Sequence, residues 1–152
     1  MIDPSWVGAG PKPFTVEVEA GRLRLFNQVL GVREAVFTDP AAARAAGHPD
    51  LPVPPTFLFG LELEHPSGQL AELGIDLGQV LHVEQGFVYH RTAHAGERLT
   101  FAPVVTDIYT RQGGALEFVV RDTAVTGAGG EPVADLHQVI AVRHGVRDEE
   151  GA

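Results

Sequence analysis

Apolar and polar residues follow two different periods along the chain. Between residues 19 and 30 the apolar positions have helical spacing, and Gly31 follows where the glycine of a helix C-cap belongs. The stretch 57–63 is apolar on almost every side, which is typical of a buried helix. Beyond Gly78 the period becomes two, which indicates strands. Four long strands are expected, at 80–90, 98–110, 115–125 and 132–142.

The expected strands are joined by short segments that contain glycine, as tight antiparallel turns require. These segments are 95–97, 112–114 and 127–131. One mostly apolar helix and an antiparallel sheet each have an apolar face that neither can bury alone. The pattern therefore predicts an α+β fold in which the sheet wraps around the central helix.

The chain has 152 residues, which suits a single domain. Residues 1–13 are rich in proline and glycine and are expected to form an irregular arm, whereas 14–144 form the domain, beginning with a short strand at 14–18. Residues 145–152 are expected to be a flexible acidic tail.

Two further segments have helical signals. Asp39 is a suitable N-cap for a short helix over 40–46, and Gly47 is a suitable stop. Residues 70–77 are expected to continue the central helix after a break at 66–68.

Charge and composition narrow the range of partners. Lysine and arginine number 11 against 20 acidic residues, so the formal net charge is −9 and no nucleic-acid partner is expected. The chain has no cysteine, which excludes disulfides, thiolate metal sites and a cysteine nucleophile. It has no apolar run of membrane-spanning length and no secretory signal at its start, so we expect no membrane partner and a cytoplasmic location.

Two long motifs point to a known family. Residues 80–99 read VLHVEQGFVYHRTAHAGERL, and residues 38–59 read TDPAAARAAGHPDLPVPPTFLF. Together they resemble the MaoC-type (R)-specific hydratases and dehydratases, specifically the N-terminal hot-dog half of that family, and the resemblance spans roughly 14–143. It implies a hot-dog fold, water addition to or removal from an acyl-CoA or acyl-carrier-protein thioester, and no metal or other cofactor.

The same resemblance implies that the family's catalytic pair is missing. Catalytic members carry an aspartate and a histidine in a motif like DxNPxH shortly before the DPxxAR segment. When this chain is aligned on Asp39 and Pro40, Val32 lies near the aspartate position and Phe37 near the histidine position. Neither side chain can transfer a proton, so the chain is expected to bind the thioester and to pair with a hot-dog subunit that carries the dyad. A homodimer and a heterodimer both remain open.

Three other functions are weighed against this one. A self-sufficient homodimeric hydratase could use His48, Glu34 or His90 as acid or base, although a solvated loop histidine is the simpler interpretation of His48. An acyl-CoA thioesterase could use Glu62 or Glu64 of the central helix; two residues apart, they cannot share a helix face. The third alternative is a thioester-binding protein without turnover.

Further residues are candidates for binding and assembly. The start of the central helix could face the thioester, with candidates Pro55, Thr56, Phe57 and Phe59. A role in subunit pairing or strand register is expected for the family-like motif residues His82, Glu84, Gln85, Tyr89, His90, Arg91 and Gly96. Of these, His82, Glu84 and His90 are expected to share one strand face. Cations that could bind the phosphates of CoA or phosphopantetheine are Lys12, Arg22, Arg24, Arg91, Arg98 and Arg111.

Overall fold

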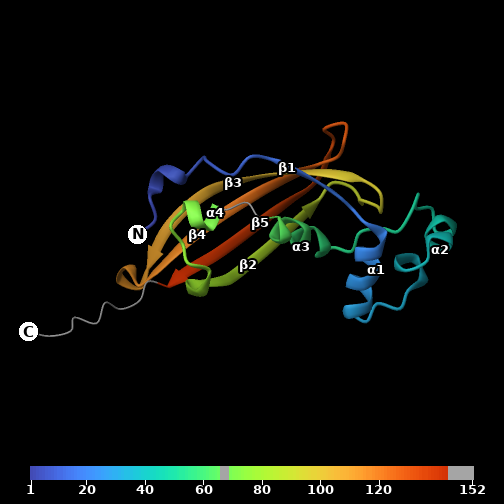
Figure 1. Cartoon of the computed structure of the whole chain (residues 1–152), viewed down its shortest axis with the longest axis horizontal. Helices are drawn as coiled ribbons and strands as arrows, with labels where there is room; N and C mark the ends of the chain where they lie inside the picture. The colour runs from blue at the N-terminus through green and yellow to red at the C-terminus, as the bar shows by residue number, and fades with distance from the viewer. Residues whose placement is uncertain (66–68, 144–152) are drawn as a thin grey trace, which may run out of the picture.

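The computed structural model describes residues 1–65 and 69–143, and its centre is a five-stranded antiparallel sheet (Figure 1). The strands are β1 (Phe14–Glu17), β2 (Val80–Tyr89), β3 (Arg98–Arg111), β4 (Leu116–Thr126) and β5 (Pro132–Arg143). Their order in the sheet is β1-β3-β4-β5-β2, so β1 and β2 form the edges. All five strands predicted from the sequence are confirmed to within one residue at each end.

The helices occupy the first half of the chain, as the periodicity predicts, although the helix expected over 70–77 already ends at Glu72. They are α1 (Ala20–Val29), α2 (Pro40–Ala45), α3 (Phe57–Glu64) and α4 (Gln69–Glu72), with short 3-10 helices at Pro4–Trp6, Ala35–Phe37, Leu77–Gln79 and Gln112–Gly114. Asp39 caps α2, because its Oδ1 accepts a hydrogen bond from the backbone N–H of Ala41 at 2.9 Å. The break expected at 66–68 and the tail expected at 145–152 lie outside the described residues.

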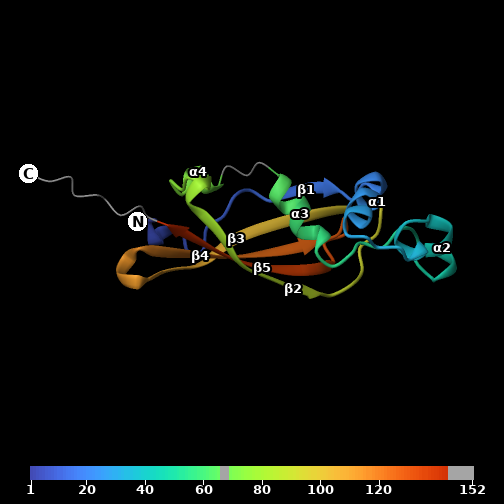
Figure 2. The same cartoon turned by 90° about the horizontal axis from the view of Figure 1, so that it is seen from below.

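Helix α3 lies against one face of the sheet, while α1 and α2 lie at one end of it (Figure 2). Phe57, Leu58 and Leu61 of α3 are buried in the main core with Leu99 and Phe101 of β3. The helix is not buried all round, however, because Leu63 is 66% exposed. The expectation of a fully buried helix is therefore wrong on one side of α3, where apolar surface remains uncovered by the described chain.

The segment before β1 contains a 3-10 helix and is attached to the sheet rather than free. The backbone N–H of Ile2 donates to both oxygens of the buried Glu117 carboxylate at 2.9 and 3.0 Å. Gly8 and Ala9 pair with the backbone of Val105 in β3, which extends the edge of the sheet beyond β1. Ile2 joins a second apolar cluster that includes Val105 of β3 and Val119 of β4. The N-terminus lies at the end of the sheet away from α1 and α2 (Figure 1).

A β-bulge in β2 changes which side chains share a face. The pairing of β2 with β5 shifts between His82 and Glu84, so strict alternation fails there. His82 stacks on Phe59 of α3, with ring centroids 5.0 Å apart, whereas Glu84 lines a hollow on the opposite face. The prediction that His82, Glu84 and His90 share a face is therefore wrong for His82.

Candidate functional site

The segment aligned with the family dyad is held between α1 and α2. The side-chain amide of Asn27, a fully buried residue, donates to the carbonyl of Phe37 at 3.0 Å, and the backbone carbonyl of Asn27 accepts from the N–H of Val32 at 2.9 Å. Asn27 thus fixes both positions. Val32 and Phe37 are half-buried, and neither offers an atom that can carry a proton. Glu34, between them, is exposed, and its carboxylate accepts from the N–H of Arg33 at 3.1 Å.

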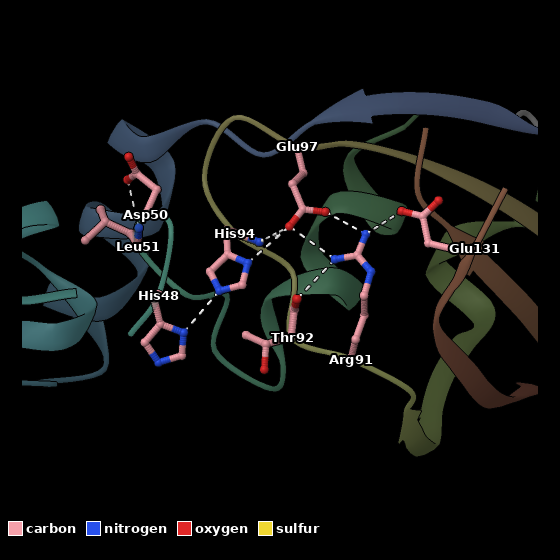
Figure 3. A network of polar contacts seen from close by, with 8 residues as sticks. All are labelled: His48, Asp50, Leu51, Arg91, Thr92, His94, Glu97 and Glu131. Carbon is pink, nitrogen blue, oxygen red and sulfur yellow. Dashed lines mark hydrogen bonds and ion pairs between the residues drawn. The ribbon is translucent and has the colours of Figure 1, made fainter. Parts of the chain in front are cut away.

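His48, in contrast, is part of a polar network at the same end of the molecule (Figure 3). Its Nδ1 lies 3.1 Å from Nε2 of His94, and Nδ1 of His94 lies 3.2 Å from Oε1 of Glu97. Arg91 holds the same carboxylate with both guanidinium ends, at 3.2 and 2.7 Å, and reaches Glu131 at 2.9 Å. The network joins the loop after α2 to the turn between β2 and β3.

The order of the network determines which nitrogen of His48 accepts hydrogen bonds. A carboxylate only accepts, so Nδ1 of His94 donates to Glu97. Nε2 of a neutral His94 is then an acceptor, and Nδ1 of His48 must donate to it. This leaves Nε2 of a neutral His48 with a lone pair, which is the arrangement of an oriented base.

The charges in this network stabilise one another. Burial pushes the pKa of Glu97 upward, but hydrogen bonds from Arg91 and His94 and the positive charge of Arg91 outweigh it, so the pKa of Glu97 is lowered. The hydrogen bond to Glu97 is also the largest cause of the raised pKa of Arg91. Glu97 is therefore an anion at neutral pH and keeps the network oriented.

The start of α3 is tied to β2. The phenol of Tyr89 donates to the carbonyl of Pro55, and burial raises the pKa of Tyr89 to about 12, so this phenol is a neutral donor at physiological pH. Thr56 is exposed and makes no side-chain cap bond. The four candidate binding residues at the start of α3 do not share one environment. Phe57 is buried against Phe26 in the core, whereas Phe59 lines a cavity.

That cavity, of about 660 Å³, lies between α3, α4 and the sheet. Its apolar wall includes Leu70, Leu73, Ile75, Leu77, Val105, Val119 and Ile140. Polar groups from α3 and the strands also line it: Glu62, His82, Arg121 and Gln138. The size and the mostly apolar wall suit an extended aliphatic chain.

The two helix carboxylates have different surroundings. Glu62 is 5% exposed and accepts from the Thr123 hydroxyl at 2.5 Å, with Nη2 of Arg121 at 3.4 Å. Glu64 is exposed and pairs with Arg22. A carboxylate held by a hydroxyl and a guanidinium is a weak nucleophile, so this geometry does not favour a thioesterase.

The other motif residues are positioned by β2 and the turn after it. Gln85 points to the α3 side with its Oε1 buried and without a hydrogen bond among the described residues. His90 pairs with Asp135 of β5 at 2.8 Å. Gly96 has φ +85°, a conformation that favours glycine, and its N–H bonds to the carbonyl of Val18.

Three of the expected phosphate-binding cations already have partners. Arg22 and Arg91 are occupied by Glu64 and Glu97, and Arg111 lies over the ring of Tyr109 at 5.2 Å. Within the described ranges, no three histidine or acidic side chains are placed to hold a metal ion. None of the helices in these ranges has the length and apolar character needed to span a membrane.

Sequence reasoning missed the residues that complete these sites. His94 and Glu97 lie within the motif at 80–99, but the family resemblance implies no role for either, and Asn27 has the spacing of an ordinary helix residue. Arg121 and Gln138 look like polar positions of alternating strands. Their roles depend on the residues that they contact in the tertiary structure, and local sequence spacing does not predict those contacts.

Several solved structures with the same hot-dog architecture are described as hydratases or dehydratases. The HadBC (3R-hydroxyacyl-ACP dehydratase) complex from Mycobacterium tuberculosis matches with a TM-score of 0.78 at 23% identity, covering 90% of this chain and 96% of that one. The ChsH1-ChsH2 complex from the same organism matches with a TM-score of 0.69 at 25% identity, covering 91% and 88%. An (R)-hydratase, PhaJ1 from Pseudomonas aeruginosa, has a TM-score of 0.69 at 20% identity, covering 96% and 89%.

The chain belongs to the family described as the FAS1-like dehydratase domain region, whose model matches residues 5–136. A UPF0336 protein from Saccharopolyspora erythraea is 34% identical over 154 residues, which covers 99% of this chain and 97% of that protein. A UPF0336 protein from Streptomyces coelicolor is 38% identical over 117 residues, covering 74% and 77%. The hot-dog fold and the resemblance to MaoC-type dehydratases are thereby confirmed.

Proposed function

We propose that this chain is the acyl-binding subunit of a 3-hydroxyacyl-thioester dehydratase, or enoyl-thioester hydratase, whose Asp/His dyad is supplied by a second hot-dog subunit. The supporting observation is the combination of Val32 and Phe37 at the dyad positions with a chain-sized apolar cavity beside α3. The thioester carrier is CoA or an acyl-carrier protein.

The chemistry of hydration determines which role falls to this chain and which to the proposed partner subunit. Hydration needs a base that takes a proton from water, an acid that protonates the α-carbon, and donors for the developing oxyanion. This chain would bind the acyl part and hold the thioester near the start of α3, where Tyr89 fixes Pro55. The dyad of the partner would carry out both proton transfers.

The surface of β2 supports pairing with a second chain. β2 is an edge strand, and its exposed apolar side chains include Leu81, Val83 and Val88. Leu63 of α3 adds a further exposed apolar residue. An exposed edge with apolar side chains favours pairing with another strand. Two of the similar solved structures, HadBC and ChsH1-ChsH2, are described as complexes of two subunits.

A hydration assay tests this function. We expect the purified chain alone to leave trans-2-enoyl-CoA unchanged, because it has no dyad. Addition of a dyad-bearing hot-dog subunit should raise the hydration rate at least about a thousandfold above that of the chain alone. Loss of the conjugated enoyl absorbance is the readout. As a control, the partner's dyad histidine is replaced by asparagine, which should abolish the gained activity. A partner equally active without this chain would contradict the proposal.

The His48 network favours a second candidate, a self-sufficient hydratase with Nε2 of His48 as the base. This function predicts turnover by the chain alone and a loss of about a hundredfold or more in His48→Asn. His94→Gln should reduce turnover less, because it removes only the orienting partner. Arg44→Gln, which changes an exposed ion pair nearby, is the matched control. An inactive wild-type chain would exclude this candidate.

A further inference from the structure

The wall of the cavity beside α3 is not uniformly apolar. The strand register places Gln85 of β2, Gln138 of β5 and Arg121 of β4 directly opposite one another on three adjacent strands. Glu62 of α3 reaches the same row from the other side, 3.4 Å from Arg121. A polar row therefore crosses the sheet beneath the helix, and three of its members, Glu62, Arg121 and Gln138, line a cavity whose other lining residues are mostly aliphatic.

Gln138 is the member of this row that is least explained by the fold. Its side chain is nine-tenths buried and lines the cavity, and it makes no hydrogen bond within residues 1–65 and 69–143. An amide has two donors and an acceptor, and burying it without partners is unfavourable. His82, which also lines the cavity, is stacked on Phe59, and its imidazole ring likewise makes no hydrogen bond in these ranges.

A purely hydrocarbon ligand does not match this wall. Methylene groups lying over Gln138 would remove water from its amide and offer no hydrogen bond in return. A ligand oxygen at that depth could accept from the amide, and a hydroxyl could also donate to it. The neighbouring Glu62 and Arg121 have opposite charges, so the row provides no excess positive charge for an anionic group. A neutral oxygen fits best.

We propose that the cavity selects acyl chains that carry a hydroxyl or keto oxygen along the chain, away from the thioester, and that Gln138 beside the Glu62 and Arg121 pair binds that oxygen. This inference rests on the proposed acyl-binding function. Gln138 is then a residue that determines substrate specificity, and the substrate class is an oxygenated acyl thioester.

Calorimetric titration of the purified chain tests the selection. The probes are octadecanoyl-CoA and a series of hydroxyoctadecanoyl-CoA esters that differ in the position of the hydroxyl. We expect at least one position to bind about tenfold more tightly than octadecanoyl-CoA, which corresponds to about 1.4 kcal/mol. Equal affinities at every position would overturn the inference and leave acyl binding intact. No binding of any ester would overturn the acyl-binding function, and this inference with it.

Variants locate the effect at the polar row. Gln138→Leu should bind octadecanoyl-CoA at least as well as the wild type and lose the preference for the hydroxylated chain. Ile140→Val, in the same cavity wall, is the matched control and should retain the preference. Glu62→Gln, which keeps the shape of the side chain but removes its charge, should weaken the preference for the hydroxylated chain. If Gln138→Leu does not fold, Glu62→Gln is the variant that tests the inference. A preference unchanged in both polar variants would contradict the assignment.

Discussion

Replacing Leu58 by alanine is expected to lower the free energy of unfolding by about 3 to 5 kcal/mol. Leu58 is fully buried in the core between α3 and the sheet, so truncation removes apolar contact and leaves a cavity. Domains of this size are typically stable by only about 5 to 15 kcal/mol, so the loss would be a large part of the total. Urea unfolding followed by circular dichroism measures it.

The same helix provides the control for this prediction. Leu63 is 66% exposed, so Leu63→Ala should change the stability of the isolated chain by less than about 0.5 kcal/mol. Its effect should become larger in a complex that covers this side of α3. Similar losses for Leu58→Ala and Leu63→Ala in the isolated chain would mean that α3 is not packed as described.

Replacing Arg91 by methionine is expected to lower the free energy of unfolding by about 1.5 to 3 kcal/mol at neutral pH. The variant keeps the length of the side chain but removes the paired hydrogen bonds to Glu97, a carboxylate that is only 26% exposed. Glu97 would keep only its hydrogen bonds from His94. The matched control is Arg44→Met, because the Arg44 side chain is 60% exposed and makes a single contact with Asp50 at 3.1 Å, which should contribute little.

The effect of Arg91→Met should depend on pH with a definite sign. The folded-state pKa of Glu97 lies below its ordinary value of 4.5, so its contribution to stability is fully present above that pH and is lost as pH falls through the lowered pKa. The difference in stability between the wild type and Arg91→Met should therefore shrink as the solution is acidified below about pH 4.5. Unfolding curves between neutral and acid pH measure this. A difference that stays constant or grows on acidification would show that Glu97 is not the partner that matters.

Much of the fold could be predicted because its signals are local. A period of two in the apolar residues defines each long strand wherever the strand pairs, and the cap at Asp39 depends only on atoms within one helical turn. Alignment on Asp39 and Pro40 likewise places the dyad positions at Val32 and Phe37, and this assignment stays a prediction. The start of α3 could be placed, but not the side on which it remains exposed.

The site could be predicted only in part, because its contacts join distant segments. His48 could be singled out as a histidine beside the expected helix start. Its contacts with His94 and, through it, Glu97 depend on the loop after α2 lying along the turn between β2 and β3. The bulge after His82 is also invisible in the sequence, because it is a mismatch with β5.

The sequence by itself therefore determined the class of fold, the order of its elements and the absence of proton-transferring side chains at positions 32 and 37, since each follows from residue type and short-range spacing. The tertiary structure alone decided which polar residues meet. Gln138, Arg121 and Glu62 lie on β5, β4 and α3. They form one row only because the strand register pairs Arg121 with Gln138 and the packing of α3 on the sheet brings Glu62 beside Arg121. Because this row is buried, its polar groups favour a ligand that can form hydrogen bonds with them, since burying a polar group without a partner is unfavourable.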